Sequence, residues 1–378
     1  MRLLVLSLGF FLASCGGGTS VSPKTPGAFG DARRVIGLAA GVEHTCALLA
    51  TGRVACWGGN YKGQLGDGEK KDRDNARALA DVTDAVELVA GGFHSCVRHK
   101  SGGIGCWGDG TYGQLGDGTT VERGAGEVAG ITDAVQLAAG GHHTCAVRAT
   151  GQVACWGRNG HGQTGDPRAD VSNVPFTIPR IDDAVEVTAG ERFSCARRRS
   201  GAVTCWGDRP TALGGDQGAC DLFTRDLPPA VSKGITKLTA GGGHACAARD
   251  HASAVCWGDN RSGELGSKTD VPTCQVVEVS LGDVVELAAG RVHTCARIAT
   301  GQVACWGDND RGQLGGGTKH KGTPLPTPVP GLVDADKLVA AHDHTCALRR
   351  GGEVVCWGSN QRGELGGEGA GPVTVSVF

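Results

Sequence analysis

The sequence is poor in the features that nucleic-acid-binding surfaces need. Its 378 residues contain only two tyrosines, and 37 Lys and Arg residues against 39 Asp and Glu residues leave a formal net charge of −2. The basic residues form no extended stripe along the chain. Because nucleic-acid binding relies on clustered positive charge, we expect no nucleic-acid partner.

Local signatures of common enzymes are also missing. The chain has no Gly-x-Ser-x-Gly nucleophile elbow, no His-Glu-x-x-His zinc motif, no phosphate-binding loop and no sialidase-type Asp box. The segment DNDRG (308–312) lacks the later Glu of a calcium loop. We therefore expect no cofactor, no metal ion and no catalytic residues. Catalytic groups that converge from distant segments leave no local signature, so a hydrolase or lyase acting on an extracellular polymer is the alternative.

Long hydrophobic runs are confined to the N-terminus. The stretch MRLLVLSLGFFLASC has an apolar core from Leu3 to Ala13, which is too short to span a bilayer comfortably and is typical of an export signal. Its end, LASC (12–15), resembles the lipobox of bacterial lipoproteins. That resemblance implies that residues 1–14 are a signal peptide and that Cys15 is lipidated, with palmitate as the expected acyl chain. The alternative is ordinary secretory cleavage near Ala13.

Residues 15–33 are expected to form a flexible tether that begins at the lipidated cysteine. The segment GGGTSVSPKTPGAFGD (16–31) is rich in Gly, Ser and Pro and has too few apolar residues to fold. Under Gram-negative sorting rules, Gly16 in place of Asp implies the outer membrane. We expect an exported lipoprotein of the outer membrane or cell surface, held to the membrane by its lipid alone. The alternatives are a secreted or a periplasmic protein.

Cysteine, in contrast, is abundant and regularly spaced. Seven of the 17 cysteines stand directly before Trp-Gly, at intervals of 49 to 51 residues, and each has a second cysteine ten positions earlier. The pairs are Cys46 and Cys56, Cys96 and Cys106, Cys145 and Cys155, Cys195 and Cys205, Cys246 and Cys256, Cys295 and Cys305, and Cys346 and Cys356. A fixed period of this length indicates repeats that pack against their neighbours. Residues 34–378 are thus predicted to form one domain of seven repeats.

Each repeat is predicted to consist of short β-strands. Apolar runs such as 84–92, 94–99 and 103–108 are separated by glycine-rich turns, and no helical period is visible. A fourth, weaker run lies between repeats, for example at 327–333.

The cysteine pairs fit a hairpin. Placing Cys46 opposite Cys56 leaves Ala50-Thr51-Gly52 as a three-residue loop, with glycine at the position that needs a left-handed backbone. Directly opposed residues lie close enough for a disulfide after modest adjustment. We predict one cross-strand disulfide in each hairpin. Alternation along the strand puts Trp57 and its six equivalents on the opposite face, where we expect them to fill the layer between adjacent sheets.

A metal site is the alternative use of these cysteines. A histidine precedes the first cysteine by two positions in six repeats, at His44, His94, His143, His244, His293 and His344. His-x-Cys with one distant cysteine offers only three ligands and lacks the close cysteine pairs of structural zinc. We favour disulfides and expect the histidines to bond backbone groups at the start of a strand.

The remaining cysteines suggest one further crosslink. Without Cys15 and the seven pairs, Cys220 and Cys274 are left, and both follow Trp-Gly in consecutive repeats. We predict an eighth disulfide between repeats four and five. Disulfides persist outside the cytosol, which agrees with the export signal.

Three motifs recur in the repeats: Ala-Gly-x-x-His-Thr, Trp-Gly-x-Asn and Gly-Gln-Leu-Gly. Two segments that carry all three are AAGVEHTCALLATGRVACWGGNYKGQLGDG (39–68) and AAGRVHTCARIATGQVACWGDNDRGQLGGG (288–317). In these motifs the chain resembles the regulator-of-chromosome-condensation repeat family across all seven repeats. The resemblance implies an all-β fold, a seven-bladed β-propeller with four-stranded blades of about 50 residues each. WD and kelch repeats match less well.

Repeat four departs from this pattern. Its segment CWGDRPTALGGDQGAC (205–220) lacks Gly-Gln-Leu-Gly, and Phe193 stands where the other repeats have histidine. With Arg192 and Arg209 nearby, we mark Arg192, Phe193 and Arg209 as candidate binding residues for an acidic partner. The alternative is sequence drift with solvated charges.

The expected function is binding, because a propeller fold alone does not decide activity and loops on rigid scaffolds carry recognition residues. We expect a monomer that presents its loop-rich face to a protein or polysaccharide. A secreted propeller of the broad family inhibits β-lactamases, which favours a protein partner. Guanine-nucleotide exchange, the activity of the nuclear family member, is the least expected because small GTPases are cytosolic.

Overall fold

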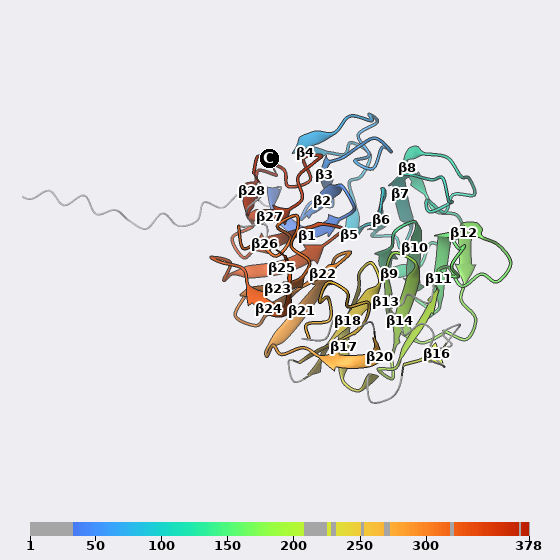
Figure 1. Ribbon diagram of the computed structural model, residues 1–378. Helices are drawn as coiled ribbons and strands as arrows, with labels where there is room; N and C mark the ends of the chain where they lie inside the picture. Colours follow the sequence, from blue (N-terminus) through green and yellow to red (C-terminus); the bar gives the residue numbers. More distant parts are fainter. Residues whose placement is uncertain are drawn as a thin grey trace, which may run out of the picture.

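The strands form seven separate four-stranded sheets arranged in a ring (Figure 1). The computed structural model describes residues 33–207, 225–227, 232–250, 253–267, 273–317, 321–369 and 372–377. Each sheet takes four consecutive strands, paired antiparallel in chain order. The chain is therefore a seven-bladed β-propeller, as the repeat period and the family resemblance predict.

The first strand of each blade is the innermost. These strands are β1 (Val35–Ala40), β5 (Ala85–Ala90), β9 (Ala134–Ala139), β13 (Ala184–Ala189), β17 (Ile235–Ala240), β21 (Val284–Ala289) and β25 (Ala335–Ala340). The second strands are β2 (His44–Leu49), β6 (His94–His99), β10 (His143–Arg148), β14 (Phe193–Arg198), β18 (His244–Arg249), β22 (His293–Ile298) and β26 (His344–Arg349).

The third and fourth strands continue each meander outward. The third strands are β3 (Val54–Gly58), β7 (Ile104–Gly108), β11 (Val153–Arg158), β15 (Val203–Gly207), β19 (Ala254–Gly258), β23 (Val303–Gly307) and β27 (Val354–Gly358). The outermost are β4 (Arg73–Ala78), β8 (Arg123–Glu127), β12 (Val171–Thr177), β16 (Arg225–Asp226), β20 (Thr273–Glu278), β24 (Thr323–Pro328) and β28 (Val373–Val375).

The outermost strands differ most from the sequence-based prediction. The expected run at 327–333 overlaps β24 by only two residues, and its apolar members Val329 and Leu332 lie beyond the strand, buried in the core. The strand itself is mostly exposed. A strand at the outer edge has little apolar surface to bury, so its sequence carries no clear alternation.

The hairpin between the second and third strands has the predicted register. Cys46 pairs with Cys56 and Leu48 with Val54, and Gly52 has a φ of 83°. The left-handed backbone costs glycine little because it has no Cβ atom. The predicted loop is therefore confirmed.

Seven disulfides join the facing cysteines across these hairpins. The Cα atoms of each pair lie 4.0–4.1 Å apart, and every sulfur-bearing residue is 0–1% exposed. The bonds join Cys46 to Cys56, Cys96 to Cys106, Cys145 to Cys155, Cys195 to Cys205, Cys246 to Cys256, Cys295 to Cys305 and Cys346 to Cys356. The alternative metal site loses its ligands to these bonds. Cys15 and Cys220 lie outside the described residues, as does the side chain of Cys274.

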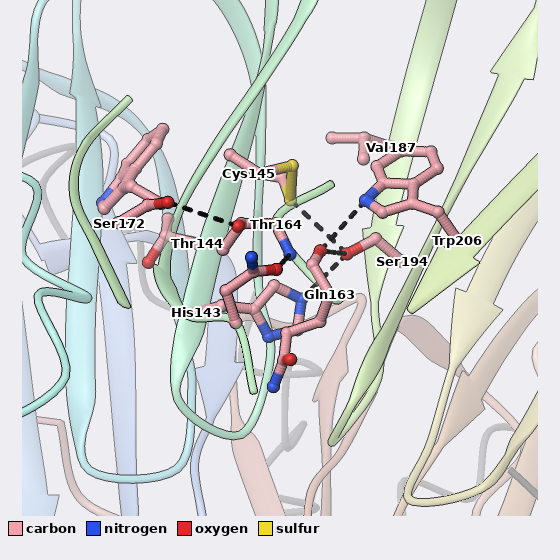
Figure 2. The surroundings of a disulfide bond; sticks show 12 residues. His143, Thr144, Cys145, Gln163, Thr164, Ser172, Val187, Ser194 and Trp206 are labelled. Atoms are coloured by element: carbon pink, nitrogen blue, oxygen red, sulfur yellow. Dashed lines mark hydrogen bonds between the residues drawn. A yellow bond between two sulfur atoms is a disulfide. The ribbon is translucent and has the colours of Figure 1, made fainter. Parts of the chain in front are cut away.

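Neighbouring blades meet through one repeated joint (Figure 2). Between the third and fourth blades, the indole N–H of Trp206 and the hydroxyl of Ser194 both donate to the backbone carbonyl of Gln163, at 2.9 and 3.0 Å. The hydroxyl in turn faces Nε2 of His143 at 2.8 Å. Because the hydroxyl hydrogen is used on the carbonyl, the imidazole Nε2–H must be the donor in this contact.

The same joint recurs around the ring. The tryptophans that donate to a preceding blade are Trp57, Trp107, Trp156, Trp206, Trp306 and Trp357. The histidine–hydroxyl pairs are His44–Ser95, His94–Thr144, His143–Ser194, His244–Thr294, His293–Thr345 and His344–Thr45, all at 2.8–2.9 Å. The tryptophans are 0–2% exposed, which confirms their predicted place between sheets. The histidines are structural, but they bond a side-chain hydroxyl of the next blade, so the expected backbone partner was wrong.

The joint between blades four and five lacks this polar pair. Phe193 occupies the histidine position, and Ala245 stands where the other blades carry Ser or Thr. Both side chains are buried, at 3% and 1% exposure, in one apolar cluster. Replacing both hydrogen-bonding partners by apolar groups leaves no buried polar atom unsatisfied, whereas replacing one would. Phe193 and Ala245 are thus an apolar version of the same joint.

The ring closes between blades seven and one with the standard joint. Trp57 and Thr45 both donate to the carbonyl of Glu364, and His344 contacts the Thr45 hydroxyl. The C-terminal strand β28 pairs with β27, so blade seven is built from the C-terminal repeat alone. Within the described ranges no strand is exchanged between the two sheets, so closure depends there on side-chain packing and hydrogen bonds.

The joint histidines must stay neutral. Burial lowers the pKa of His44, His94, His143 and His293 from 6.5 to about 3, and that of His244 and His344 to about 4. Their Nδ1 atoms have no hydrogen-bond partner among the described residues. A proton on Nδ1 would be buried without an acceptor, which is why the neutral form is favoured.

We predict that mass mapping under non-reducing conditions finds seven linked peptide pairs and no free thiol at these fourteen positions. Replacing Cys96 and Cys106 together by Ala should lower the free energy of unfolding by about 2.5–3 kcal/mol, since the ten-residue crosslink restricts the unfolded chain. Urea denaturation measures the difference. Unchanged stability of the variant, or cysteine thiols that react in the folded protein, would contradict the assignment of these cysteines to cross-strand disulfides.

We also predict a steep loss of stability in mild acid. Each joint histidine binds a proton in the unfolded chain below its ordinary pKa of 6.5 but not in the folded chain until about pH 3–4. Stability is therefore full above about pH 7 and falls by roughly 1.4 kcal/mol per pH unit per histidine below it. Burial raises the pKa of Glu264 to about 7 and also raises the pKa values of Glu43 and Asp308. These three carboxyls oppose the trend, but the six histidines outnumber them.

The apolar joint supplies the matched variant for this prediction. The double change His94→Phe with Thr144→Ala copies Phe193 and Ala245, and it should lose about 2 kcal/mol less than the wild type between pH 7.5 and 5. His94→Phe alone should be the less stable variant at pH 7.5, because Thr144 then lacks its donor. Urea denaturation midpoints of the wild type and both variants, measured across this pH range, give the comparison. A wild-type stability that stays flat down to pH 5 would refute the buried-histidine explanation.

Candidate binding face

The turns between first and second strands gather around the central axis at one face of the propeller. They surround a cavity of about 260 Å³ at the mouth of the channel. Its lining is mostly Ala and Gly, with larger side chains only at a few points. Those side chains are Val42, Phe93, His142, Glu191, Arg291 and His342. The turns between third and fourth strands lie on the same face, because Asp109 donates its backbone N–H to the Phe93 carbonyl at 2.8 Å. We call this the turn face.

Backbone hydrogen bonds hold the mouth in a fixed shape. The N–H of Val42 donates to Gly92 in the next blade at 3.0 Å, and Gly141 donates to Gly190 at 3.1 Å. Glycine is required where the turn touches the joint: a Cβ atom on Gly41 would lie 2.2 Å from His44 Cε1 and 2.4 Å from the Gly91 carbonyl oxygen. The face is therefore rigid down to its backbone.

Aromatic side chains from three blades form a continuous row on the turn face. The ring centroids of Tyr61 and Phe93 are 5.3 Å apart, those of Phe93 and His142 are 6.2 Å apart, and those of His142 and Tyr112 are 5.2 Å apart. Arg158 places its guanidinium carbon 4.9 Å from the Tyr112 ring centroid. We call Tyr61, Phe93, His142 and Tyr112 the aromatic rim. Both tyrosines of the chain belong to it.

The aromatic rim is partly accessible. Tyr61 is 40% exposed, and Phe93, His142 and Tyr112 are half-buried. Large aromatic surfaces that remain partly exposed on a rigid scaffold are typical of recognition sites. The rim is therefore the strongest candidate binding surface among the described residues.

Acidic groups surround the Tyr61 end of the rim. Burial, reinforced by Glu43, Asp109 and Asp72, raises the pKa of Tyr61 to about 12, while Arg362 acts in the opposite sense. Burial also raises the pKa of the Glu43 carboxyl. Tyr61 thus stays a neutral phenol at any physiological pH.

The Asp109 carboxylate is held by its own loop. It accepts from the Thr111 hydroxyl at 2.5 Å and from Gln114 Nε2 at 3.0 Å. Lys62 lies 3.8 Å from it but forms its shorter contact, 2.5 Å, with Glu122. Asp109 therefore contributes negative charge at a fixed position beneath the rim.

The three candidate binding residues predicted in repeat four do not lie together on one described surface. Arg192 lies exposed on the turn face. Phe193 packs inside the joint with the next blade and has 3% of its surface exposed. Arg209 lies outside the described residues.

Two further arginines of that repeat are engaged within their own blade. Arg197 pairs with Glu186 at 2.8 Å, and Arg198 with Asp183 at 2.5 Å. These ion pairs offset part of the positive charge of the repeat.

Sequence reasoning missed the aromatic rim. Its members come from two kinds of turn in three repeats, so no linear motif contains them. The available signal was the scarcity of tyrosine itself, since the two tyrosines lie at neighbouring positions of the same loop in repeats one and two.

Two negative findings apply to the described ranges. No group of three or more His, Cys, Asp or Glu side chains there could hold a metal ion. Nor does that part of the chain contain a helix long and apolar enough to cross a membrane.

The family comparisons agree with the geometry. A family model described as the RCC1-like domain matches residues 120–376, and one described as the regulator of chromosome condensation (RCC1) repeat matches residues 35–64 and 85–114. No curated protein sequence matches the chain significantly.

Solved structures share the fold at low sequence identity. Human WBSCR16 is 20% identical with a TM-score of 0.74, covering 84% of this chain and 87% of that one. Yeast RCC1 (Prp20), in its structure with Kap60, is 17% identical with a TM-score of 0.75, covering 98% of this chain and 91% of that one. Prp20p from Saccharomyces cerevisiae, described with its binding to Gsp1p and histones, is 19% identical with a TM-score of 0.73. The match covers 92% of this chain and 88% of that one. At these identities the likeness concerns the fold alone.

Proposed function

The chain belongs to the RCC1-like domain family, and on that premise we propose that it is an exported, lipid-anchored module that binds a partner protein at the cell envelope. The observation that carries the proposal is the aromatic rim, which offers four aromatic side chains on one rigid face. Binding through loops of a rigid scaffold is a common use of such a fold.

Export is supported by the disulfides. Seven crosslinks, each inside a buried hairpin, indicate an oxidising environment, because thiols in the cytosol are kept reduced. The lipobox-like LASC segment supports lipidation of Cys15. An acyl chain on Cys15 would tether the propeller to the membrane surface.

The described part of the chain begins at the face opposite the aromatic rim. Arg34, directly before β1, accepts a hydrogen bond from Ala50 in the hairpin loop, at the end of the blade far from the turn face. A tether attached there lets the turn face point away from the membrane. The rim would then be open to partners.

A protein is the favoured partner over a polysaccharide. The yeast relative with this fold has been crystallised with Kap60 and is described as binding Gsp1p and histones. The rim combines aromatic rings with fixed charges, the composition of protein-binding hot spots.

We predict that Cys15→Ser abolishes membrane association when the chain is expressed with its own leader in a bacterial host. In this proposal the acyl group is what holds the propeller to the bilayer. Fractionation by detergent partitioning measures the change. Partitioning identical to wild type would reject the lipid anchor, while leaving the binding proposal standing.

We also predict that partner capture depends on the rim. The full chain, purified with its disulfides intact, should retain a specific envelope protein, and Tyr61→Ala with Phe93→Ala should lower the recovered amount at least tenfold. The matched control is Val333→Ala, a change at a 56%-exposed residue of the opposite face. Quantitative mass spectrometry of the bound fraction provides the measurement. Equal recovery by the rim variant and the control would contradict binding at the turn face.

A further inference from the structure

We infer that the Tyr61 end of the aromatic rim recognises an arginine or lysine side chain of the partner, with Glu43 as its counter-ion. The inference rests on the proposed binding function and names the chemistry that the same site would select. It commits to a basic segment of a protein as the occupant.

The rim already shows how it binds a cation. Arg158 stacks its guanidinium on Tyr112, 4.9 Å from the ring centroid. This is the geometry in which a cation is attracted by the ring quadrupole. Tyr61 and Phe93, 5.3 Å apart and tilted by 59°, form a second pair of rings, on which no described cation is stacked. Tyr61 leaves 40% of its surface open to a partner.

The charge around this second ring pair is complementary to a cation. Glu43, Asp109 and Asp72 all act on Tyr61 as negative neighbours. Arg362 and Lys62 are the nearby positive charges, and both are engaged by other carboxylates. Nη1 of Arg362 lies 3.2 Å from Asp72, and Nζ of Lys62 lies 2.5 Å from Glu122. The local excess is therefore acidic on a chain whose overall charge is only −2.

Glu43 supplies an unfilled acceptor. Its Oε2 atom is buried and has no hydrogen-bond partner among the described residues. The nearest cation, Nε of Arg362, is 4.0 Å away, beyond hydrogen-bonding distance. A buried carboxylate oxygen without a donor is costly. The Glu43 side chain as a whole is 28% exposed. A guanidinium or ammonium group placed on Tyr61 could therefore approach the carboxylate from its open side and donate to it.

Position favours a side chain that projects from a partner's surface. Glu43 directly follows Val42, which lines the mouth cavity of about 260 Å³, and Phe93 lines the same cavity. The flexible stem of Lys or Arg can lie along the rings while its head reaches the carboxylate. A sugar could also stack on the rings, but it would not need the negative charge.

The test compares three probes on the full chain with intact disulfides. They are a fluorescein-labelled peptide Gly-Arg-Gly-Arg-Gly, the same peptide with citrulline in place of arginine, and a labelled linear glucohexaose. Citrulline keeps the shape of arginine and removes its charge. Fluorescence polarisation measures Kd at 20 and 200 mM salt.

We expect the arginine peptide to bind at least tenfold more tightly than the citrulline peptide and the hexaose, and to weaken with salt. Tyr61→Ala and Glu43→Gln should each weaken it about tenfold. Tyr61→Phe should retain binding, because the ring rather than the hydroxyl is needed. Glu353→Gln, a change at the opposite face, is the charge-matched control and should have no effect.

Equal binding of the arginine and citrulline peptides would overturn the inference, as would an unchanged Kd in folded Glu43→Gln. Tighter binding of the hexaose, lost in Tyr61→Ala, would overturn it in favour of a glycan. These outcomes are separable from the proposed function: a rim-dependent protein partner could still be captured while the arginine preference fails. Thermal unfolding of each variant confirms that a lost signal reflects binding and not folding.

Discussion

At six joints among the described residues, one backbone carbonyl links the two neighbouring blades. The carbonyl of Gln163 and its equivalents accepts both the indole N–H and the hydroxyl of the next blade, and a neutral histidine donates to that hydroxyl. Each hydrogen bond contributes about 1 kcal/mol net, but leaving any of these buried groups unpaired costs more. Since each sheet is built from its own repeat, the ring is as stable as its weakest joint.

The joint also determines what the turn face can do. Tyr61, Phe93 and His142 belong to successive blades, and their spacing is fixed only because the blades cannot slide. The disulfide within each hairpin holds the strand that carries the joint histidine and hydroxyl against the strand that carries the tryptophan. Covalent stiffness inside a blade and hydrogen bonding between blades thus act on the same strands, and both favour a preformed recognition surface.

Sequence periodicity predicted the parts of this structure that repeat. The hairpin register, the left-handed Gly52 and the buried tryptophans follow from spacing alone. The outer strands did not, because a strand such as β4 has no fully buried residue and carries no apolar pattern. The pairing of Phe193 with Ala245 was visible in principle: both departures stand at joint positions, one repeat apart. Nothing in the sequence order places Tyr61 beside Phe93.

The most direct test of the joint is hydrogen exchange at the tryptophan indoles, followed by NMR. Trp57, whose N–H donates across the closure to Glu364, should exchange as slowly as Trp107 and Trp306, which donate across internal joints at 2.9 and 2.7 Å. All three should exchange only through global unfolding. A Trp57 indole that exchanges orders of magnitude faster than the others would show that the ring opens between blades seven and one, and would contradict the equivalence of the joints.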